Sequence, residues 1–560
     1  MKNIKKTLST LLLISMLLSL LCACKGGKSE PKNDDPKSDS SYKLNIDGYK
    51  IIRAYSSSAD LHSSFGNLRD ALIEKTGMEK FVFAYDLDLE DEGGCEILLG
   101  KTNRKESIDA LNELSEKTKK EAFIIKLTDK KIVITGHSDD DIRVAIIYFT
   151  KNFVKTLTSK DKTLVFPQKD YTFMQKTGEL HAVCNEGNNA VLISGLTTIY
   201  SPSDPLSEKD YSYAKIIKLE HQADKKNNGI LIASNQNNTG DPWDIYHSYD
   251  DGKTWEESPK IEETVNPNYS EGYQPYLFEL PVDIGEFKKG TVLFAACSYN
   301  GEYTKLPLFA STDQGKTWTG LHNIAEGEAY NQGDWSSDGV WEPCIVYDDK
   351  SGRLYCFYSD ELENGDPITH EGGNNQRLVY KYTDDLKTWS KEYNAVALGE
   401  KRPGMAMVTK MGNGQWALVY EHVGNGGTPV YIKFTDDINN WNPSDPGKLL
   451  ATEEGQYFGS SPSIAWTPMG GECGTLIATG FGNVAGSKGT KCDLFLSFDY
   501  GKTFVTVKNP IPVTWNDNVS SGYGSGFYVD SSGTLYYTND PELRVGLSCG
   551  KLMFVKIRFF

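Results

Sequence analysis

Residues 248–255 read SYDDGKTW, and residues 311–318 read STDQGKTW. The pattern returns as SFDYGKTF at 497–504 and, in weaker form, as YTDDLKTW at 382–389 and FTDDINNW at 434–441. The Asp and Gly of each copy suit a tight turn between two strands, and the Trp or Phe at its end can pack between neighbouring sheets. A turn of this kind that recurs along the chain indicates a fold built from repeated antiparallel sheets.

These copies resemble the Asp box, S-x-D-x-G-x-T-W, which sialidase-like β-propellers carry. Each copy follows the previous one at about the length of a four-stranded blade, and we expect its residues to be structural rather than catalytic. Five copies and one blade without a copy predict six blades. The expected fold is mainly β: a six-bladed sialidase-like β-propeller over residues 178–560, preceded by a small α/β domain. The strand-like residues 552–560 are expected to close the ring by pairing with the first blade.

Residues 42–170 differ from the rest, because segments with helical periodicity alternate with short apolar runs. This alternation predicts a small α/β domain of two layers. No convergent polar cluster is apparent in it, so we expect it to be a spacer or a docking module. The expected helices are 65–77, 107–119 and 138–154, and the expected strands are 96–100, 123–127 and 131–135, of which the last two form a hairpin.

The N-terminus has the features of an export signal. Three lysines precede an apolar run over residues 8–21, which is typical of a signal peptide. The run ends in LCAC, which resembles a lipobox, because an aliphatic residue stands three positions before Cys24 and Ala stands directly before it. The resemblance implies that residues 1–23 are removed and that the sulfur of Cys24 carries a diacylglycerol. Residues 24–41 are polar and predict a flexible tether, so we expect a protein anchored by lipid at the extracellular face of the cell membrane.

The composition narrows the range of partners. The chain has 560 residues and a formal net charge of −17, and a chain this acidic argues against a nucleic-acid partner. The Cys residues are scattered without C-x-x-C or another metal-ligand spacing, so we expect neither a metal nor another cofactor. The charge fits a secreted protein that acts on a neutral polymer.

The first candidate catalytic residue is Glu342, in the stretch GDWSSDGVWEP of residues 333–343. The Pro that follows it cannot donate to a β ladder, so Glu342 is expected at the start or the edge of a strand. Trp335, Asp338 and Trp341 stand close by and could give a sugar an aromatic platform and a carboxyl group an apolar setting. The alternative is an ordinary Glu in a surface loop.

The second candidate is Glu421, which ends the apolar run WALVYE of residues 416–421. A charge at the end of a buried strand is costly unless it is paired or used. Upstream, Arg402 in the stretch KRPGM could pair with a carboxylate or hold sugar hydroxyls. The alternative for Glu421 is an exposed strand end.

Two carboxyl groups on neighbouring blades that face one axis suit glycoside hydrolysis. One group protonates the leaving oxygen, and the other attacks the sugar or activates water. Five stretches between the boxes occur in a specific order: QPYLFELP at 274–281, DGVWEP at 338–343, YSDE at 358–361, RPGM at 402–405 and YE at 420–421.

Together these stretches resemble glycoside hydrolase family 93, the exo-α-1,5-L-arabinanases with a sialidase-like propeller. The resemblance implies two glutamates that act with retention and release arabinobiose from the ends of arabinan. By motif these are Glu342, assigned as acid/base, and Glu421, assigned as nucleophile, although the two roles could be exchanged. The resemblance also implies an active-site Tyr near the end of the propeller, for which Tyr523 in SGYGSG is the candidate; the alternative is a Tyr in a turn.

Two other functions remain open. Exo-sialidases share the boxes and the propeller, but they hold the substrate carboxylate with three arginines and carry an Arg-Ile-Pro motif on the first blade. Here the comparable run, YAKIIKL at 213–219, has no Arg. The other possibility is a carbohydrate-binding propeller without catalysis, which would not need both glutamates. The arginines of the propeller are Arg353, Arg377, Arg402, Arg544 and Arg558.

Overall fold

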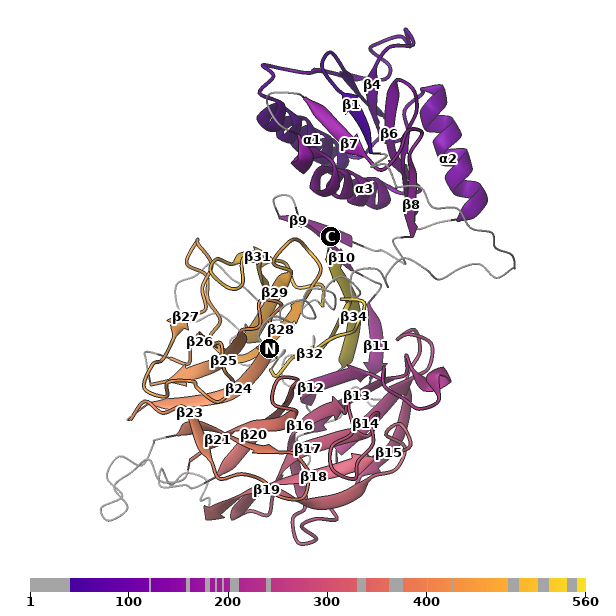
Figure 1. Ribbon diagram of the computed structural model, residues 1–560. Coiled ribbons are helices and arrows are strands. Elements are labelled where there is room, and N and C mark those ends of the chain that lie inside the picture. Colours follow the sequence, from indigo (N-terminus) through magenta and orange to yellow (C-terminus); the bar gives the residue numbers. More distant parts are fainter. Residues whose placement is uncertain are drawn as a thin grey trace, which may run out of the picture.

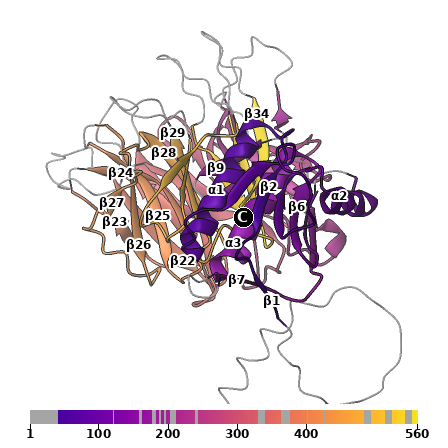
Figure 2. The ribbon, with the colours of Figure 1, turned by 90° about the horizontal axis from the view of Figure 1, so that it is seen from above.

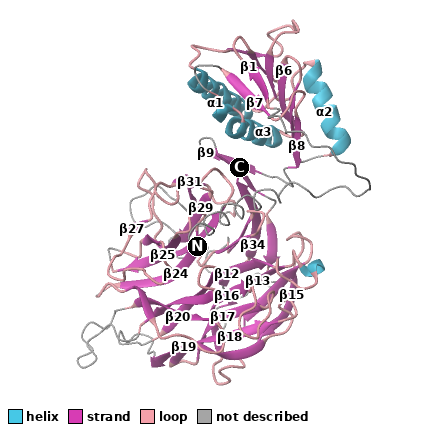
Figure 3. Ribbon diagram, viewed as in Figure 1, coloured by secondary structure: helices cyan, strands magenta, loops and turns pink. Residues whose placement is uncertain are grey.

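The protein consists of an α/β domain and a β-propeller, seen from two directions in Figures 1 and 2 and by secondary structure in Figure 3. The structure is a computed structural model. It describes residues 41–119, 122–157, 162–176, 182–186, 189–193, 196–201, 211–237, 243–329, 339–361, 376–399, 401–424, 427–481, 493–511, 523–540 and 551–559.

The α/β domain is built on a six-stranded mixed sheet of order β3-β2-β4-β6-β5-β8, beside a two-stranded sheet of β1 and β7. Helices α1 and α3 pack on one face of the large sheet, whereas α2 packs on the other. The domain therefore has three layers, and the expectation of two layers was wrong, because α2 buries its own apolar stripe on the second face. Its elements are β1 (Tyr42–Asn45), β2 (Lys50–Arg53), α1 (Ala59–Thr76), β3 (Val82–Tyr85), β4 (Glu96–Leu99), α2 (Lys105–Lys117), β5 (Ala122–Leu127), β6 (Lys131–Gly136), α3 (Asp139–Asn152), the 3₁₀ turn η1 (Val154–Thr156), β7 (Thr163–Phe166) and β8 (Thr172–Lys176).

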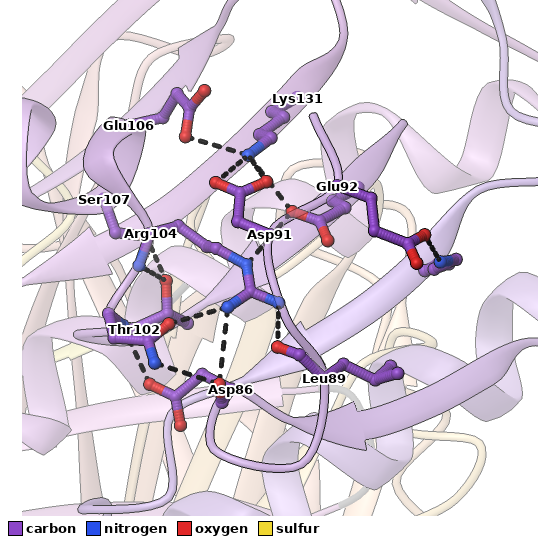
Figure 4. A network of polar contacts seen from close by, with 12 residues as sticks. Asp86, Leu89, Asp91, Glu92, Thr102, Arg104, Glu106, Ser107 and Lys131 are labelled. Carbon is purple, nitrogen blue, oxygen red and sulfur yellow. Dashed lines mark hydrogen bonds and ion pairs between the residues drawn. The ribbon is translucent and has the colours of Figure 1, made fainter. Parts of the chain in front are cut away.

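The α/β domain also contains a buried ionic network that the sequence did not reveal (Figure 4). Lys131 Nζ lies 2.8 Å from Asp91, 3.0 Å from Glu106 and 3.3 Å from Glu96. Arg104 donates to the same Glu96 at 3.4 Å and, through Nη2, to the Leu89 carbonyl oxygen at 2.7 Å. The charged groups of this network satisfy one another, so the network ties α2 and the loop after β3 to the sheet and offers no open site.

The propeller has six antiparallel sheets (Figure 1). The first strands of neighbouring sheets touch one another in a closed circle, so these strands line the axis. Each of the first five blades has four consecutive strands. The first blade contains β12 (Tyr211–Lys218), β13 (Leu231–Asn237), β14 (Trp243–Ser248) and β15 (Glu256–Ile261), and the second contains β16 (Glu271–Glu279), β17 (Val292–Tyr299), β18 (Tyr303–Ser311) and β19 (Thr319–Ala329). The third contains β20 (Val340–Asp348), β21 (Arg353–Asp360), β22 (Arg377–Thr383) and β23 (Tyr393–Val396); the fourth contains β24 (Arg402–Lys410), β25 (Trp416–Val423), β26 (Val430–Thr435) and β27 (Lys448–Leu449); and the fifth contains β28 (Ser460–Thr467), β29 (Thr475–Phe481), β30 (Leu494–Ser497) and β31 (Val505–Val507).

The sixth blade joins both ends of the propeller chain. It contains β32 (Gly526–Val529), β33 (Leu535–Asn539) and β34 (Leu552–Phe559), and its outer strand is β11 (Thr197–Tyr200). Strands β9 (Ala182–Glu186) and β10 (Asn189–Ile193) extend the same sheet, and β10 also pairs with β34. The C-terminal strand thus belongs to the last blade, and the expectation that it pairs with the first blade was wrong. The ring is closed by the strand that precedes the first blade, which supplies the missing edge.

Each Asp-box copy forms the turn between the third and fourth strands of its blade. In the second blade, Asp313 Oδ1 accepts from Ser311 Oγ at 2.8 Å and from the Thr317 amide at 2.9 Å, while Oδ2 accepts from Thr317 Oγ1 at 2.7 Å. Trp318 Nε1 donates to the Gly315 carbonyl oxygen at 3.0 Å. The box residues bind one another, which agrees with a structural role.

We expect Asp313→Ala to destabilise the propeller without changing its chemistry. The substitution leaves the Thr317 and Ser311 donors without their acceptor, so the free energy of unfolding should fall by about 1–3 kcal/mol. Urea denaturation measures this loss, and activity per folded molecule should stay at the wild-type level. A large loss of activity at unchanged stability would contradict the structural assignment of the box.

The α/β domain lies beside the strands that close the ring (Figure 1), where α3 lies next to β9 and β10. Lys151 of α3 donates to the Gly470 carbonyl oxygen of the propeller at 3.2 Å. Over the described ranges, no helix is long and apolar enough to cross a membrane. The predicted signal peptide and most of the predicted tether lie outside those ranges.

Candidate active site

The axial strands share a bulge at the same position, and these bulges form the candidate site. In each of the first five blades the pairing of the first and second strands shifts register around a residue with positive φ, and in the sixth blade a Gly with positive φ stands just before β32. Such bulges redirect side chains and often lie next to active sites. Glu342 is the bulge residue of the third blade, with φ 65°. The six positions are Tyr213, Gln274, Glu342, Met405, Ser461 and Gly524.

A circle of hydrogen bonds links the six bulges, because each bulge amide donates to a group of the preceding blade. The Glu342 amide donates to Gln274 Oε1 at 3.0 Å, and the Met405 amide donates to Glu342 Oε2 at 2.7 Å. The Ser461 amide donates to Glu421 Oε2 at 3.3 Å. The circle continues through the Gly524 amide to Ser461 Oγ at 2.6 Å, the Tyr213 amide to the Tyr523 carbonyl oxygen at 2.9 Å and the Gln274 amide to Gln236 Oε1 at 3.0 Å. Both candidate glutamates are therefore fixed by the blade that follows them.

The carboxyl group of Glu342 is held from several blades. Ser359 Oγ donates to Oε2 at 2.8 Å, beside the Met405 amide. Tyr213 OH and Gln274 Nε2 approach Oε1 at 3.3 and 3.4 Å. Glu342 lines a cavity of about 20 Å³ with Tyr213 and Gln274, so its carboxyl group lies on the axis rather than in a surface loop.

Glu421 reaches the same site from the second strand of the fourth blade, where it pairs with Gly404. Ser460 Oγ donates to Glu421 Oε2 at 2.6 Å. A Cβ at Gly404 would lie 2.8 Å from Gln376 Nε2 and 3.4 Å from Glu421 Oε1, so a side chain there would displace Gln376 while it touched the carboxyl group at an ordinary distance. The carboxyl group of Glu421 faces the bulges, so Glu421 is not an exposed strand end, which was the alternative from the sequence.

Tyr523, from the turn before β32, lies near both glutamates, whose charges add to burial in raising the pKa of its hydroxyl group. Its ring packs against Tyr213 at a centroid distance of 5.4 Å and against Phe481 at 5.6 Å. Its hydroxyl points to Met405 Sδ at 3.5 Å. Tyr213 is a further site residue, which no motif in the sequence indicated. The structure gives it a direct contact with Glu342.

The predicted substrate-binding residues differ in their contacts, and two of them lie outside the described residues. Arg402 contacts Glu361 and lies 2.9 Å from Gln376 Oε1, so its guanidinium group is already occupied by protein groups. Trp341 donates from Nε1 to the same Glu361 at 3.2 Å, which fixes the indole ring beside Glu342. Trp335 and Asp338 lie outside the described residues. In the part of the chain that is described, no three His, Cys, Asp or Glu side chains come together as a metal site.

Burial controls the ionisation of the two carboxyl groups. Desolvation, with the charge of Glu421 added, raises the pKa of Glu342 to about 7. Desolvation also raises the pKa of Glu421, but hydrogen bonds from Ser460 and Ser461 and the charge of Arg402 oppose that rise. Glu342 therefore keeps its proton near neutral pH although it accepts hydrogen bonds from Ser359, Met405 and Tyr213, whereas Glu421 has a cation, Arg402, that favours its ionised form. A pair of carboxyl groups with this difference can act as a proton donor and a nucleophile.

The raised pKa of Glu342 predicts a pH-dependent stability. Between the ordinary Glu value of about 4.5 and about 7 the folded state keeps a proton that the unfolded state loses, so the stability contribution is lost as pH rises through this window. In Glu342→Gln the loss is absent. Its stability relative to wild type should rise by about 2–3 kcal/mol between pH 4.5 and pH 8. Urea denaturation of both proteins across this range measures the effect, and parallel pH curves would contradict it.

A six-bladed propeller with two half-buried, hydrogen-bonded carboxyl groups at its axis defines a glycoside hydrolase of the sialidase-like architecture. Comparisons with known proteins place the chain more closely. No family model matches the chain, and no curated protein sequence matches it. Solved structures do match it.

An α-L-arabinanase of Penicillium chrysogenum, solved with arabinobiose, is 30% identical to this chain, with a TM-score of 0.53. The match covers 65% of this chain and 97% of that one. An α-L-arabinofuranosidase of family 93 from Fusarium graminearum, also solved with arabinobiose, is 25% identical, with a TM-score of 0.54. That match covers 65% of this chain and 98% of the other. A structure of a Fusarium graminearum α-L-arabinofuranosidase with an iminosugar inhibitor is 25% identical, and that match covers 68% of this chain and 98% of the other. The chain belongs to glycoside hydrolase family 93.

Proposed function

We propose that the protein is an exo-acting, retaining arabinanase that cleaves α-1,5-linked L-arabinan from chain ends and releases arabinobiose. One observation carries the proposal: the bulges bring Glu342 and Glu421 from neighbouring blades to one axial site, with the higher resistance to ionisation at Glu342. The relatives solved with arabinobiose support this choice of sugar.

The chemistry follows from the two carboxyl groups. Glu421, as the carboxylate, attacks the anomeric carbon while Glu342 gives its proton to the leaving glycosidic oxygen, which forms an arabinobiosyl ester and frees the shortened chain. Glu342 then takes a proton from water, the water oxygen attacks the anomeric carbon, and the ester bond to Glu421 breaks. Tyr213 and Tyr523 stay neutral throughout, since burial, above all, and the nearby carboxylates raise their pKa values. Their hydroxyl groups are fixed donors to the site.

The contacts of the arginines do not favour the sialidase alternative. Arg377 contacts Asp360 and Arg402 contacts Glu361, while the guanidinium group of Arg353 lies over the Tyr382 ring at 4.5 Å. Arg558 donates to Thr534 on the sixth blade. Among the arginines of the propeller whose positions are described, Arg402 is the one whose charge reaches a candidate glutamate, and it contacts Glu361, so these arginines do not form a set of three around a sialic acid carboxylate.

The decisive experiment offers the purified protein two substrates. Linear arabinan should yield arabinobiose from its ends, and sialyllactose should yield nothing. Proton NMR of the first product should show the anomeric configuration of the substrate, because two displacements retain it. Release of sialic acid would overturn the substrate assignment, and a protein that binds arabinan without cleaving it would be a carbohydrate-binding propeller instead.

We also propose that the protein is exported and anchored by a lipid on Cys24 at the extracellular face of the cell membrane. The support is the lipobox-like LCAC at residues 21–24 and the polar segment after it. The tether would let the propeller reach polymeric arabinan away from the membrane surface.

The lipobox-like stretch contains two cysteines, Cys22 and Cys24, so substitution of one can serve as the control for substitution of the other. Cys24→Ala should abolish incorporation of labelled fatty acid and release the protein from the membrane fraction. Cys22→Ala should leave both unchanged, because the bulky Leu21 before Cys22 does not fit a lipobox. Label retained in Cys24→Ala would contradict the proposed anchor.

A further inference from the structure

Below the ring of bulges, the axis of the propeller is a channel. Two residues beyond each bulge is the next inward position of each axial strand, and three of these residues, Lys215, Tyr276 and Met407, line the channel. Those positions hold Lys215, Tyr276, Cys344, Met407, Ser463 and Gly526. Lys215 lies between two spaces: it lines the cavity of about 20 Å³ that also contains Glu342, and it lines a larger cavity of about 390 Å³ beyond it.

Lys215 brings a charge to a place where its neighbours are neutral. Tyr276 and Cys344 share its layer, and burial raises the pKa of both, so neither is ionised near neutral pH. Tyr213 on its own strand is neutral for the same reason. The other titratable groups around the larger cavity are Tyr347 on β20, Tyr528 on β32, His221 after β12, Glu279 on β16 and Lys410 on β24.

The groups farther along the channel are engaged elsewhere. Glu279 accepts from the amides of Glu220 at 2.7 Å and His221 at 3.1 Å, and Tyr528 donates to Glu220 at 2.9 Å. Lys410 pairs with Asp348 and Asp349. Glu342 is therefore the carboxyl group that shares the smaller cavity with Lys215.

We propose that Lys215 is a positioning residue that acts on Glu342 through space. Its side chain lines the cavity beneath the bulges, and its positive charge favours the ionised form of Glu342, which eases proton release to the leaving group. The shared cavity has room for about one water molecule, so little solvent screens the two charges. Burial in turn lowers the pKa of Lys215 to about 8, and the interactions with Cys344 and then with Glu342 oppose that fall. The inference rests on the proposed role of Glu342 as acid/base.

The test replaces Lys215 by residues of similar length. Lys215→Met removes the charge, Lys215→Gln removes it with a polar group in its place, and Lys215→Arg keeps it. Infrared difference spectra against Glu342→Gln isolate the carboxyl band of Glu342 and give its titration midpoint without any substrate. We expect the midpoint to rise by about 0.5–1 pH unit in Lys215→Met and Lys215→Gln and to stay near the wild-type value in Lys215→Arg.

Activity gives a second reading on arabinan. The alkaline limb of the kcat/KM profile should move to higher pH by the same amount in the two neutral variants, because Glu342 keeps its proton longer. Lys433→Met is the matched control: Lys433 is a buried lysine off the axis, and its ammonium group donates to the Ala395, Asn442 and Asp445 carbonyl oxygens. That variant should lose stability without moving the limb.

The outcomes separate the two proposals. A folded Lys215→Met or Lys215→Gln with an unmoved Glu342 midpoint overturns the role of Lys215, whatever the substrate. A wild-type protein that does not cleave arabinan overturns the proposed function, while the infrared midpoints still decide the coupling between Lys215 and Glu342.

Discussion

Glu421→Gln should lower kcat/KM on arabinan by about 10⁴-fold or more, the largest effect that we expect from a single substitution. The amide cannot attack the anomeric carbon, and no other described carboxyl group of the site lies where Glu421 does, opposite Gly404. The variant should fold, because Gln can keep the bond from Ser460 Oγ through its carbonyl oxygen. Initial rates over a range of arabinan concentrations measure the loss.

The stereochemistry of rescue identifies the nucleophile. In Glu421→Ala, azide can enter the space of the missing side chain and attack an activated aryl arabinobioside, and the product should be an arabinobiosyl azide of inverted configuration. Glu279→Gln is the matched control, since Glu279 is also a carboxyl group whose pKa burial raises but lies at the far end of its axial strand. It should keep its activity per folded molecule. An azide of retained configuration would assign the nucleophile to Glu342.

Glu342→Gln should lower kcat/KM on arabinan by about 10²–10⁴-fold, because the proton for the leaving oxygen is missing. The loss should depend on the leaving group. A nitrophenyl leaving group departs without protonation, so the bond-breaking step on an aryl arabinobioside should proceed at a rate close to that of wild type. A burst of nitrophenol followed by slow turnover would mark the accumulated arabinobiosyl ester.

The second step of the reaction provides the control for Glu342. In Glu342→Ala, azide needs no general base and should speed the release of the ester, with an arabinobiosyl azide of retained configuration as product. The alkaline limb of the pH profile, which reflects the pKa near 7, should disappear in this variant. An equal loss on aryl and polymeric substrates would exclude Glu342 as the proton donor.

The same backbone feature serves both the fold and the chemistry. A β-bulge interrupts the ladder and leaves its amide unpaired, and in this propeller each such amide finds its acceptor on the preceding blade. The site therefore depends on the closure of the ring, in which β11 completes the sixth blade. A rigid circle of this kind holds Glu342 and Glu421 at a fixed spacing before any substrate arrives.

Part of the site could be read from the chain. Trp341-Glu342-Pro343 and Tyr420-Glu421 stood out, because a carboxyl group beside a Pro or at the end of an apolar run needs a reason. The sequence holds a further signal, a Pro that directly follows Gln274, Glu342 and Ser461 at the start of an axial strand. This Pro marks the shared bulge. Tyr213 and Met405 lack that Pro, and only their place in the ring reveals them.

The sequence by itself determined the architecture, since the six-bladed propeller and the α/β domain before it follow from local patterns. A turn that binds its own Asp, an apolar run and a helical stripe each act over a few residues, so they are visible along the chain. The tertiary structure decided what those patterns could not contain. It set the acceptor for each bulge amide, engaged Arg402 with Glu361, closed the ring with β11 and placed Lys215 under Glu342. These relations join residues far apart in the chain, and their energies depend on burial and distance, which exist only once the blades surround one axis.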